Sequence, residues 1–485
     1  MRSSIFNVRV PLPDRNEVFL MNTLTDAQVV VPESAAALLD SLDDDEALEE
    51  VDRTGRFTAE ERQALETLAG LGFIVRNREA DRQALDAYFR EVREDATELR
   101  LTILTTLQCN FACDYCIQGD HGDYNRHAHR MSPETAAQVV KFAEAKLDAL
   151  GSKRLVVTFF GGEPLLNLPV LYDLAERLHA ASTARGVTFL INIITNGLLL
   201  TPELVDRLVP LGLNGVKVTL DGDRETHDRH RPLRGGQGTF DRIIGNIRAV
   251  AGRCRIAIGG NFDADSADSY PALLDYLAAQ DFAPAIAKVA FKPVIRAPRP
   301  DATSSARGRR GVTIPLIPVS EEGVPLGGTC MTAAGAGAPA SSRAASACDS
   351  CHFADDTMAF LREETKKRGF STPDGVHMGP CEIHRRHAYT IGPDGALYAC
   401  PGFSGERTMA VGHIASEGNA RTAMADRFDA LAAWKQCGDC AFIPVCAGGC
   451  SAAAHNELGD MDAPACHRRS FESALSALAA DAARS

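Results

Sequence analysis

Three cysteines crowd into eight residues of this 485-residue chain, at Cys109, Cys113 and Cys116. They follow directly on the apolar run 101–107, so their loop is expected to leave a buried strand. A structural zinc site closes four ligands around one ion, whereas three thiolates can hold a [4Fe-4S] cube and leave one iron open. The spacing therefore predicts an iron–sulfur centre with a chemical role, rather than three unrelated buried thiols.

The composition narrows the class of protein and of partner. The chain has 51 Lys and Arg residues against 64 Asp and Glu residues, and this net charge of −13 disfavours nucleic acid as a partner. Charged residues interrupt positions 1–20, which predicts no signal peptide, and no apolar run is long enough to span a membrane. A cytoplasmic location is expected, where the 14 cysteines serve as metal ligands more readily than as disulfides.

The central part of the chain, residues 96–296, alternates buried-type strands with helical patterns. The clearest helix begins at the cap Ser132 with Pro133 in its first turn and ends before Gly151. Six such units predict an α/β fold whose parallel sheet curls into a partial (β/α)6 barrel of the TIM type. The predicted strands are 101–105, 155–160, 188–194, 215–220, 254–262 and 287–294.

The flanking parts have different patterns. Residues 1–95 predict a small α+β domain, with an antiparallel sheet in 5–31 and a helix at 58–71 that begins with a capping box. Residues 297–375 are predicted as a flexible insertion or linker, because the stretch 332–347 lacks the residues that build a core. A short helix is expected near 355–368. Residues 376–485 form a cysteine-rich domain.

Candidate ligands follow the predicted strands. The second strand runs into Gly161, Gly162, Glu163 and Pro164, where glycines allow close backbone approach and a carboxylate can accept from an ammonium group. Polar residues also end or follow the third and fourth strands, and turn formation is the competing interpretation of two of them, an Asn and an Asp. These further candidates are Asn196, Thr219, Asp221 and Arg231.

The C-terminal part carries a second set of regularly spaced cysteines. The intervals include C-x2-C, C-x5-C and C-x3-C, and two glycines precede the sixth cysteine. Iron–sulfur ligation and two zinc knuckles are the competing interpretations of this pattern. The seven residues are Cys381, Cys400, Cys437, Cys440, Cys446, Cys450 and Cys466.

Four cysteines lie outside both patterns. Cys254 is expected to be a buried small hydrophobe on a strand. Cys330 lies in the insertion and carries no interpretation. Cys348 and Cys351 form a C-x2-C-H phrase that formally matches a haem attachment site, but the expected location disfavours haem. A redox or cluster-ligating role and no chemical role stay open for this pair.

The first cysteine loop, with Tyr115 before its last cysteine, and the Gly-Gly-Glu-Pro phrase one strand later resemble the signature of the radical S-adenosylmethionine (SAM) superfamily. This resemblance implies a [4Fe-4S] cluster on Cys109, Cys113 and Cys116. It also implies that the segment containing Glu163 binds the methionyl amine of SAM. The superfamily's peptide-modifying members contact the SAM ribose or carboxylate with a polar residue of the third strand and with the arginine that matches Arg231.

The seven later cysteines resemble the SPASM extension of the same superfamily, which holds two auxiliary [4Fe-4S] clusters and would bring the total to three. The resemblance implies one cluster on three cysteines and one on four. The inner set is Cys381, Cys400 and Cys450, and the outer set is Cys437, Cys440, Cys446 and Cys466. The inner set lacks a fourth ligand, for which the candidates are a substrate thiolate, His384, His387, Cys348 and Cys351. An open or substrate-ligated site is expected.

Residues 1–95 resemble, in the phrases 22–25 and 71–75, the winged-helix-like domain that recognises leader peptides in peptide-modifying systems. A plain structural extension is the competing interpretation. Together these resemblances imply an oxidoreductase that uses a 5′-deoxyadenosyl radical to abstract hydrogen from a ribosomally made precursor peptide, forming a thioether or carbon–carbon cross-link. Flavodoxin or ferredoxin is the expected electron donor. The alternative is formylglycine formation by a sulfatase-maturase type, although Pro401 stands where that group carries a catalytic Asp. A non-catalytic iron–sulfur electron carrier is the alternative from another class.

Overall fold

A nine-stranded mixed sheet organises the molecule, which is described here as a computed structural model covering residues 1–42, 57–116, 129–295, 342–373, 375–376, 379–416 and 422–483. Its strand order is β11-β10-β9-β8-β7-β6-β12-β13-β14. All neighbouring pairs from β11 to β12 are parallel, and the last two pairs are antiparallel. The parallel strands are β6 (Glu98–Thr106), β7 (Arg154–Gly161), β8 (Thr188–Thr195), β9 (Leu213–Thr219), β10 (Ile256–Phe262), β11 (Ile286–Pro293) and β12 (Ala388–Ile391).

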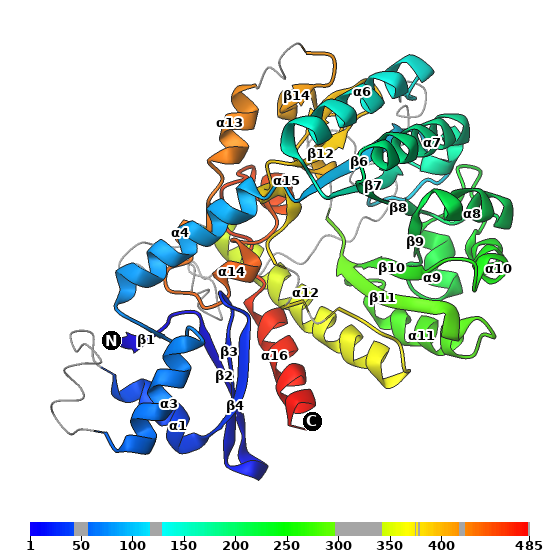
Figure 1. Ribbon diagram of the computed structural model, residues 1–485. Coiled ribbons are helices and arrows are strands. Elements are labelled where there is room, and N and C mark those ends of the chain that lie inside the picture. The colour runs from blue at the N-terminus through cyan, green and yellow to red at the C-terminus, as the bar shows by residue number, and fades with distance from the viewer. Residues whose placement is uncertain are drawn as a thin grey trace.

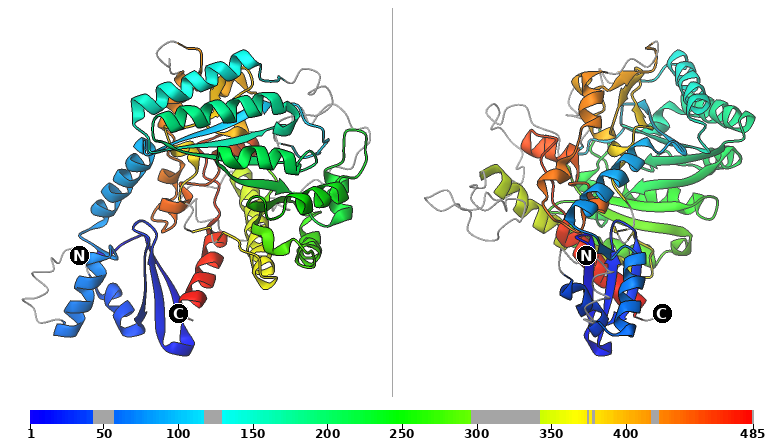
Figure 2. Two further views of the ribbon diagram at one scale, coloured as in Figure 1. Left: turned by 45° about the vertical axis from the view of Figure 1, so that its right-hand side comes forward. Right: turned by 60° about the vertical axis from the view of Figure 1, so that its left-hand side comes forward.

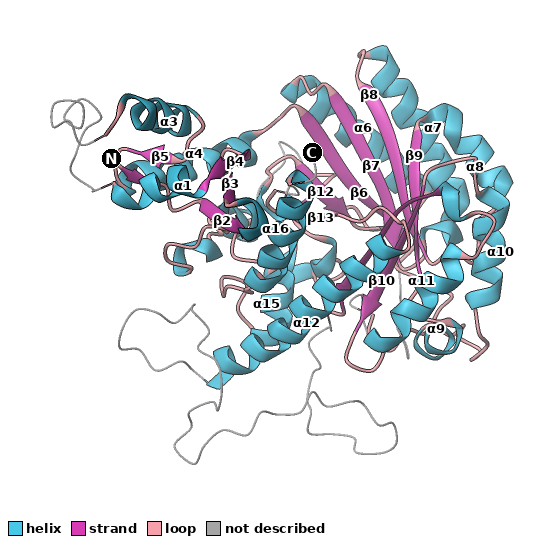
Figure 3. Ribbon diagram, turned by 90° about the horizontal axis from the view of Figure 1, so that it is seen from below, coloured by secondary structure: helices cyan, strands magenta, loops and turns pink. Residues whose placement is uncertain are grey.

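The six strands predicted for the central part are therefore present, each within a few residues of its expected bounds. Helices follow the strands and cover the outer face of the sheet, as the view from below shows (Figure 3). They are α6 (Pro133–Leu150), α7 (Leu168–Ala184), α8 (Pro202–Leu208), α9 (Arg224–His230), α10 (Phe240–Val250) and α11 (Tyr270–Ala278). The result is a mixed α/β fold in which a parallel sheet dominates.

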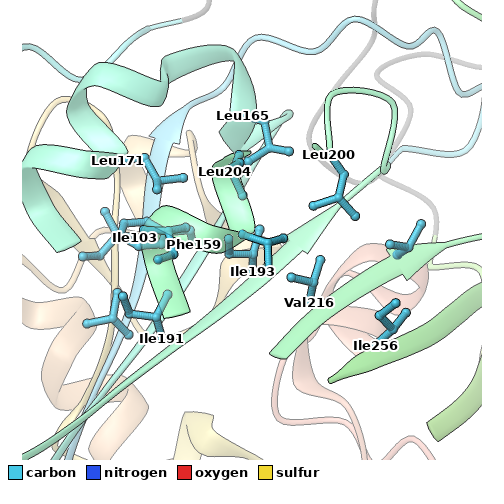
Figure 4. Packing of buried hydrophobic residues seen from close by; sticks show 14 of the residues in the cluster. Ile103, Phe159, Leu165, Leu171, Ile191, Ile193, Leu200, Leu204, Val216 and Ile256 are labelled. Atoms are coloured by element: carbon cyan, nitrogen blue, oxygen red, sulfur yellow. The ribbon is translucent and has the colours of Figure 1, made fainter. Parts of the chain in front are cut away.

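Alternation along the strands builds the core on the side of these helices. In β8, Phe189, Ile191 and Ile193 are buried, while the residues between them are half-buried on the other face. Ile103, Phe159 and Leu171 lie in the same cluster, and the close-up shows them converging between sheet and helices (Figure 4). Ser132 caps α6 by accepting from the Thr135 N–H, as its sequence predicts.

The C-terminal region completes the central sheet. β12 pairs with β6, and β13 (Ala396–Tyr398) and β14 (Gly412–His413) extend the edge. Short helices follow, namely α13 (Ala423–Asp429), α14 (Ile443–Cys446) and α15 (Ser451–Leu458). The sequence pattern separated this region from the barrel, because short strands give a weak local signal and pairing between residues some 290 positions apart gives none.

The N-terminal region forms a small α+β unit that lies below the barrel in Figure 1. Its antiparallel sheet has the order β2-β3-β4, and a second pair joins β1 to β5. The predicted capping box of α3 is present, with Thr58 and Glu61 bonding to each other's backbone N–H groups. The elements are β1 (Arg2–Ser3), β2 (Asn7–Leu12), β3 (Glu17–Asn22), β4 (Ala27–Pro32), α1 (Glu33–Leu38), α3 (Ala59–Gly70), β5 (Ile74–Val75) and α4 (Arg78–Glu94).

The two ends of the chain share one hydrophobic core. Helix α16 (Arg468–Ala482) lies beside the N-terminal sheet in both views of Figure 2. Leu475 and Ala479 of α16 pack with Phe19 and Met21 of β3, and all four side chains are buried. The N-terminal unit is therefore held against the C-terminal region and is not an independent appendage.

Helix α12 (Ser342–Lys367) corrects the prediction for the insertion. Residues 342–347 were expected to be flexible, yet they form its first turns, and the helix predicted near 355–368 begins thirteen positions earlier. Alanine has the highest helix propensity, and the packing of α12 against α16 and β11 stabilises the helix. Positions 332–341 lie outside the described residues. No helix of the described chain is long and apolar enough to cross a membrane.

Candidate active site and cysteine centres

The first cysteine loop leaves β6 at the carboxyl edge of the parallel sheet, where barrel sites lie. Phe111 pairs with Leu233 as an isolated bridge, and the Ala112 N–H donates to the Pro232 carbonyl, which pins the loop to the segment after α9. Burial raises the pKa of Cys109 and of Cys113 to about 12, and each of these thiols also feels the charge of Cys116. The three thiols are therefore neighbours in the loop that follows β6.

Two glycines at the end of β7 let that strand touch the base of the loop. Gly161 has φ +135°, and a Cβ on it would lie 2.2 Å from the Thr106 carbonyl oxygen. A Cβ on Gly162 would lie 2.2 Å from the Gln108 carbonyl oxygen. Any larger residue would push the second strand away from the cysteine loop, so both positions require glycine.

Glu163 follows these glycines and is completely buried. Its carboxylate accepts from the Leu165 N–H at 3.0 Å, the Thr195 hydroxyl at 2.8 Å and the Asn196 N–H at 2.8 Å. Burial raises the pKa of Glu163, and its charge in turn raises the pKa of Cys109. A fixed, buried carboxylate beside the thiols is suited to receive a cationic ligand group.

Asn196 connects this carboxylate to the cysteine loop. Its side-chain amide donates to Asn110 Oδ1 at 2.7 Å, while its own Oδ1 accepts from the Leu198 N–H at 3.0 Å. The turn interpretation of Asn196 is therefore correct, and the loop contact adds a second role. Thr219, at the end of β9, is half-buried. Pro164 is buried, and its carbonyl accepts from the Thr105 hydroxyl at 3.1 Å.

Asp221 and Arg231 form a buried ion pair against the loop. Arg231 Nη1 lies 3.3 Å from Asp221 Oδ2, and it donates to the Tyr115 hydroxyl oxygen at 2.5 Å. The Tyr115 hydroxyl donates to Asp221, and the Arg231 guanidinium lies 5.5 Å from the Phe111 ring centroid. Asp221 also accepts from the Asn261 N–H at 2.7 Å. This network orders the cysteine loop, and Arg231 Nε is left with no hydrogen-bond partner among the described residues.

The inner set of C-terminal cysteines comes together from three separate segments. The pKa of Cys400 is raised to about 12, first by burial and then by the charges of Cys381 and Cys450. Cys450 has the same effect on Cys381. Because such interactions act at short range, the three thiols are neighbours.

The outer set is also assembled. The pKa of Cys446 is raised to about 12, first by burial and then by the charges of Cys437, Cys466 and Cys440. Cys440 and Cys466 raise the pKa of Cys437 as well. The four thiols therefore form a second group, distinct from the inner one.

Two glycines place these two groups side by side. Gly449 has φ +95°, and a Cβ on it would lie 1.9 Å from the Ala465 carbonyl oxygen, while the Ala465 N–H donates to the Gly448 carbonyl at 2.8 Å. The next residue after Gly449 is Cys450 of the inner set, and the next after Ala465 is Cys466 of the outer set. The predicted glycine pair thus joins the two cysteine groups through direct backbone contact.

Residues 103–258 match the model of a protein family described as the Radical SAM superfamily. This segment is therefore a Radical SAM domain. The chain shares 30% identity over 162 residues with GTP 3′,8-cyclase of Clostridium perfringens, covering 33% of this chain and 44% of that one. The serine-type anaerobic sulfatase-maturating enzyme of Bacteroides thetaiotaomicron is 30% identical over 144 residues, covering 29% and 34%. The matched segment spans less than half the length of either relative.

The structure of anSMEcpe with bound AdoMet and Kp18Cys peptide is similar in fold. The TM-score is 0.52 at 16% identity, and the match covers 79% of this chain and 99% of that one. This likeness supports the parallel-dominated α/β architecture described above.

The donor chemistry fits iron–sulfur clusters. Ten of the eleven cysteines whose side chains are described fall into the three neighbouring groups. No group of three or more His, Cys, Asp or Glu side chains in the described chain is arranged to hold a single metal ion. This does not count against a [4Fe-4S] cube. Each thiolate of a cube binds a different iron, so the sulfurs lie farther apart than the ligands of a single metal ion. Iron would also stabilise thiolates whose pKa burial raises.

The sequence also singled out a histidine and four cysteines outside the three groups. His384 is buried, and its ring packs against Phe89 and Trp434 with centroid distances of 6.2 and 5.4 Å. The pKa of His384 is lowered to about 4, mainly because its ring is buried. Cys254 is half-buried, in keeping with a packing role. The side chains of Cys330, Cys348 and Cys351 lie outside the described residues, so their roles stay predictions.

Several residues of the site were missing from the sequence interpretation. Thr195 and Asn110 fix Glu163 and Asn196, and Asn261 fixes Asp221. Arg234 adds a contact from its Nε to the Cys109 carbonyl at 3.2 Å. These residues adjoin recognisable motifs in sequence or in space, but their types are common in turns, so spacing alone could not single them out.

Proposed function

We propose that this radical SAM enzyme modifies a ribosomally made precursor peptide by abstracting a hydrogen atom from it, and that the product is a thioether or carbon–carbon cross-link. The observation that carries this proposal is the common neighbourhood of the site residues. The first cysteine loop and buried Glu163 lie at the carboxyl edge of the barrel sheet, and Lys292 near the end of β11 acts electrostatically on Cys400 of the inner set.

In this proposal Cys109, Cys113 and Cys116 would hold a [4Fe-4S] cluster that leaves one iron without a protein ligand. Glu163 accepts the methionyl ammonium group, which its buried and pre-ordered carboxylate favours. When bound, the cluster and SAM supply an electron and a radical that takes hydrogen from the substrate. The Asp221–Arg231–Tyr115 network holds the loop in register with the barrel, so the reactive groups stay aligned.

The C-terminal cysteines would hold two auxiliary clusters. Cys381, Cys400 and Cys450 provide three thiolates, so a substrate cysteine can complete the set and be deprotonated there. Removing an electron from the modified substrate is the other use of such a centre. Both uses suit an oxidative cross-link, for which the peptide must lose two hydrogens. Flavodoxin or ferredoxin would supply the reducing electron.

The N-terminal unit is proposed to hold the leader segment of the precursor. Within the described residues β4 pairs only with β3, so its other edge offers backbone groups to which an extended peptide could add. The shared core with α16 would hold a bound leader at a fixed distance from the cysteine groups. We propose a cytoplasmic location for the enzyme, where it would meet the newly made precursor peptide.

Formylglycine formation is the second candidate, because a sulfatase-maturating enzyme is among the relatives. That chemistry needs a base, and the residue after Cys400 is Pro401, which offers no proton acceptor on its side chain. The peptide cross-link therefore remains the preferred proposal. An electron carrier without SAM chemistry would need no pre-ordered carboxylate beside the first cysteine loop.

The proposal is tested by co-expressing the chain with short open reading frames encoded beside its gene and measuring peptide mass. We expect one such peptide to lose two hydrogens when iron and SAM are available, and to remain unchanged with a chain that lacks Cys109, Cys113 and Cys116. Purified, reduced protein that fails to cleave SAM would overturn the proposal and favour the electron carrier.

A further inference from the structure

A cavity of about 390 Å³ lies within the barrel, on the face of the sheet that the outer helices leave uncovered. Most of its wall comes from side chains at alternate positions of β6 to β11, and Glu382 next to Cys381 closes one side. The polar neutral part of the wall includes Thr102, Thr158 and Asn192. Its size matches sites for small ligands or a few peptide residues.

Cross-strand register sets two ammonium groups in one row of this wall. Lys217 of β9 pairs with Ala257 of β10, and Ala257 pairs with Lys288 of β11. The residues around the lysines are small. A Cβ on Gly259 would lie 2.2 Å from Lys217 Cε, so the glycine makes room for the lysine stem. Because these neighbours are small, the cavity stays open beside the two amino groups. Bulkier residues at the same positions would fill it.

The charges of the wall do not balance. The acidic residue Glu382 is already paired with Arg100, whereas Lys217, Lys288 and Arg255 have no ion pair within the described residues. Burial first, and then the charges of Lys292 and Lys288, lower the pKa of Lys217 to about 8. An anion in the cavity would relieve the desolvation of Lys217 and the mutual repulsion of these ammonium groups.

Lys292 extends this cationic wall towards the inner cysteines. It pairs with Asn261 across β10 and β11, it interacts with Lys217, and its charge lowers the pKa of Cys400. The wall strands use their backbone N–H groups in the sheet, so recognition of an anion falls on side-chain ammonium groups. That arrangement suits a carboxylate, whereas phosphate sites are commonly built from free backbone amides.

We propose that Lys217, Lys288 and Lys292 form a binding site for a carboxylate of the peptide substrate, so that the enzyme selects peptides with an acidic side chain near the reacting position. This inference rests on the proposed peptide-modifying function and names its substrate class. The carboxylate would sit in the barrel while the reacting segment lies between the first cysteine loop and the inner cysteines.

The test uses a fluorescent, capped heptapeptide of glycine and serine with two glutamates, and the same peptide with glutamines. Binding to the iron-loaded full-length protein is measured by anisotropy without reductant. We expect the glutamate peptide to bind about tenfold more tightly, as one charge-assisted hydrogen bond would give, and the difference to shrink as salt is added. The Lys217→Gln/Lys288→Gln variant should bind both peptides equally.

The matched control is Lys141→Gln/Lys153→Gln, which removes two exposed lysines outside the cavity and should keep the preference. Lys288→Gln alone changes an exposed side chain, so it should keep its fold and iron and lose about threefold in affinity for the glutamate peptide. Equal binding of the two peptides to the unmodified protein would overturn the inference. So would a preference that survives in Lys217→Gln/Lys288→Gln.

Two further outcomes separate the alternatives. GTP that displaces the glutamate peptide more effectively than the unlabelled peptide does would assign the cavity to phosphate and overturn the carboxylate assignment. The proposed function is judged separately, from SAM cleavage by the reduced, unmodified protein. Failure to cleave SAM with an intact peptide preference would reject the function and leave the binding site standing.

Discussion

The two cysteine-bearing regions of this molecule are built in opposite ways. The barrel loop places Cys109, Cys113 and Cys116 within eight residues, at the end of one buried strand. The C-terminal centres draw seven cysteines from segments between positions 381 and 466. Local spacing in the sequence brings the cysteines together in the first region. Long-range packing brings them together in the second.

The supports of the two regions differ accordingly. The barrel loop rests on a network of side chains, Asp221 with Arg231 and Glu163 with Asn196. The C-terminal groups rest on direct backbone contact at Gly448 and Gly449, where no Cβ fits. The barrel site should therefore tolerate conservative changes that reduce binding, whereas a single methyl group should dismantle the C-terminal centres.

The largest effect is expected for Gly449→Ala. Its Cβ would fall 1.9 Å from the Ala465 carbonyl oxygen at a φ of +95°, so the segments carrying Cys450 and Cys466 must separate. We expect the variant to lose about two thirds of its iron, the share of two clusters in three, and to keep the barrel cluster. Iron analysis after anaerobic reconstitution measures this.

Gly459→Ala is the matched control for that variant. Gly459 has φ +73° but nothing within 4 Å of an added Cβ, so only the modest cost of the left-handed conformation applies. It should bind as much iron as the unmodified protein. An equal loss in both variants would show that backbone conformation matters here and not the contact with Ala465.

Next in size is Leu475→Ala on α16. Leu475 is 3% exposed in the core shared with the N-terminal sheet, so the cavity should reduce the free energy of unfolding by about 2–5 kcal/mol. Urea unfolding measures the change, and Leu478→Ala, on a half-buried neighbour, should cost less. If the N-terminal unit were independent of the C-terminal region, the shared core would contribute little and the loss would stay below this range.

A smaller effect is expected for Glu163→Gln in the barrel. The amide keeps the shape of the side chain but removes the charge that would meet the SAM ammonium group. SAM affinity should fall about tenfold with iron content unchanged, as equilibrium binding to reconstituted protein would report. Glu134→Gln, on the exposed first turn of α6, is the control. Unchanged affinity in Glu163→Gln would remove this residue from the SAM site.

The contrast between the regions also explains what the sequence could predict. The cap at Ser132, the capping box at Thr58 and the six barrel strands follow from local patterns, and all are present. The grouping of the outer and inner cysteines came from a family resemblance, and the neighbouring thiols agree with it.

Other features could not be predicted, for physical reasons. Pairing of β12 with β6 joins residues far apart in the chain, and no local period records it. The lysine row of Lys217 and Lys288 depends on register between strands and on which face the helices cover. The early start of α12 could not be predicted either, because Ala-rich first turns alone do not fix an isolated helix.

The central claim is that the barrel loop alone supports SAM chemistry, while the C-terminal cysteines hold separate clusters. Replacing Cys109, Cys113 and Cys116 by alanine tests it most directly, with iron and 5′-deoxyadenosine measured on the same reconstituted sample. The unmodified protein should bind about twelve irons and cleave SAM after reduction, and the variant should keep about eight and cleave none. Cleavage that persists in the variant, or iron that is lost entirely, would contradict the account.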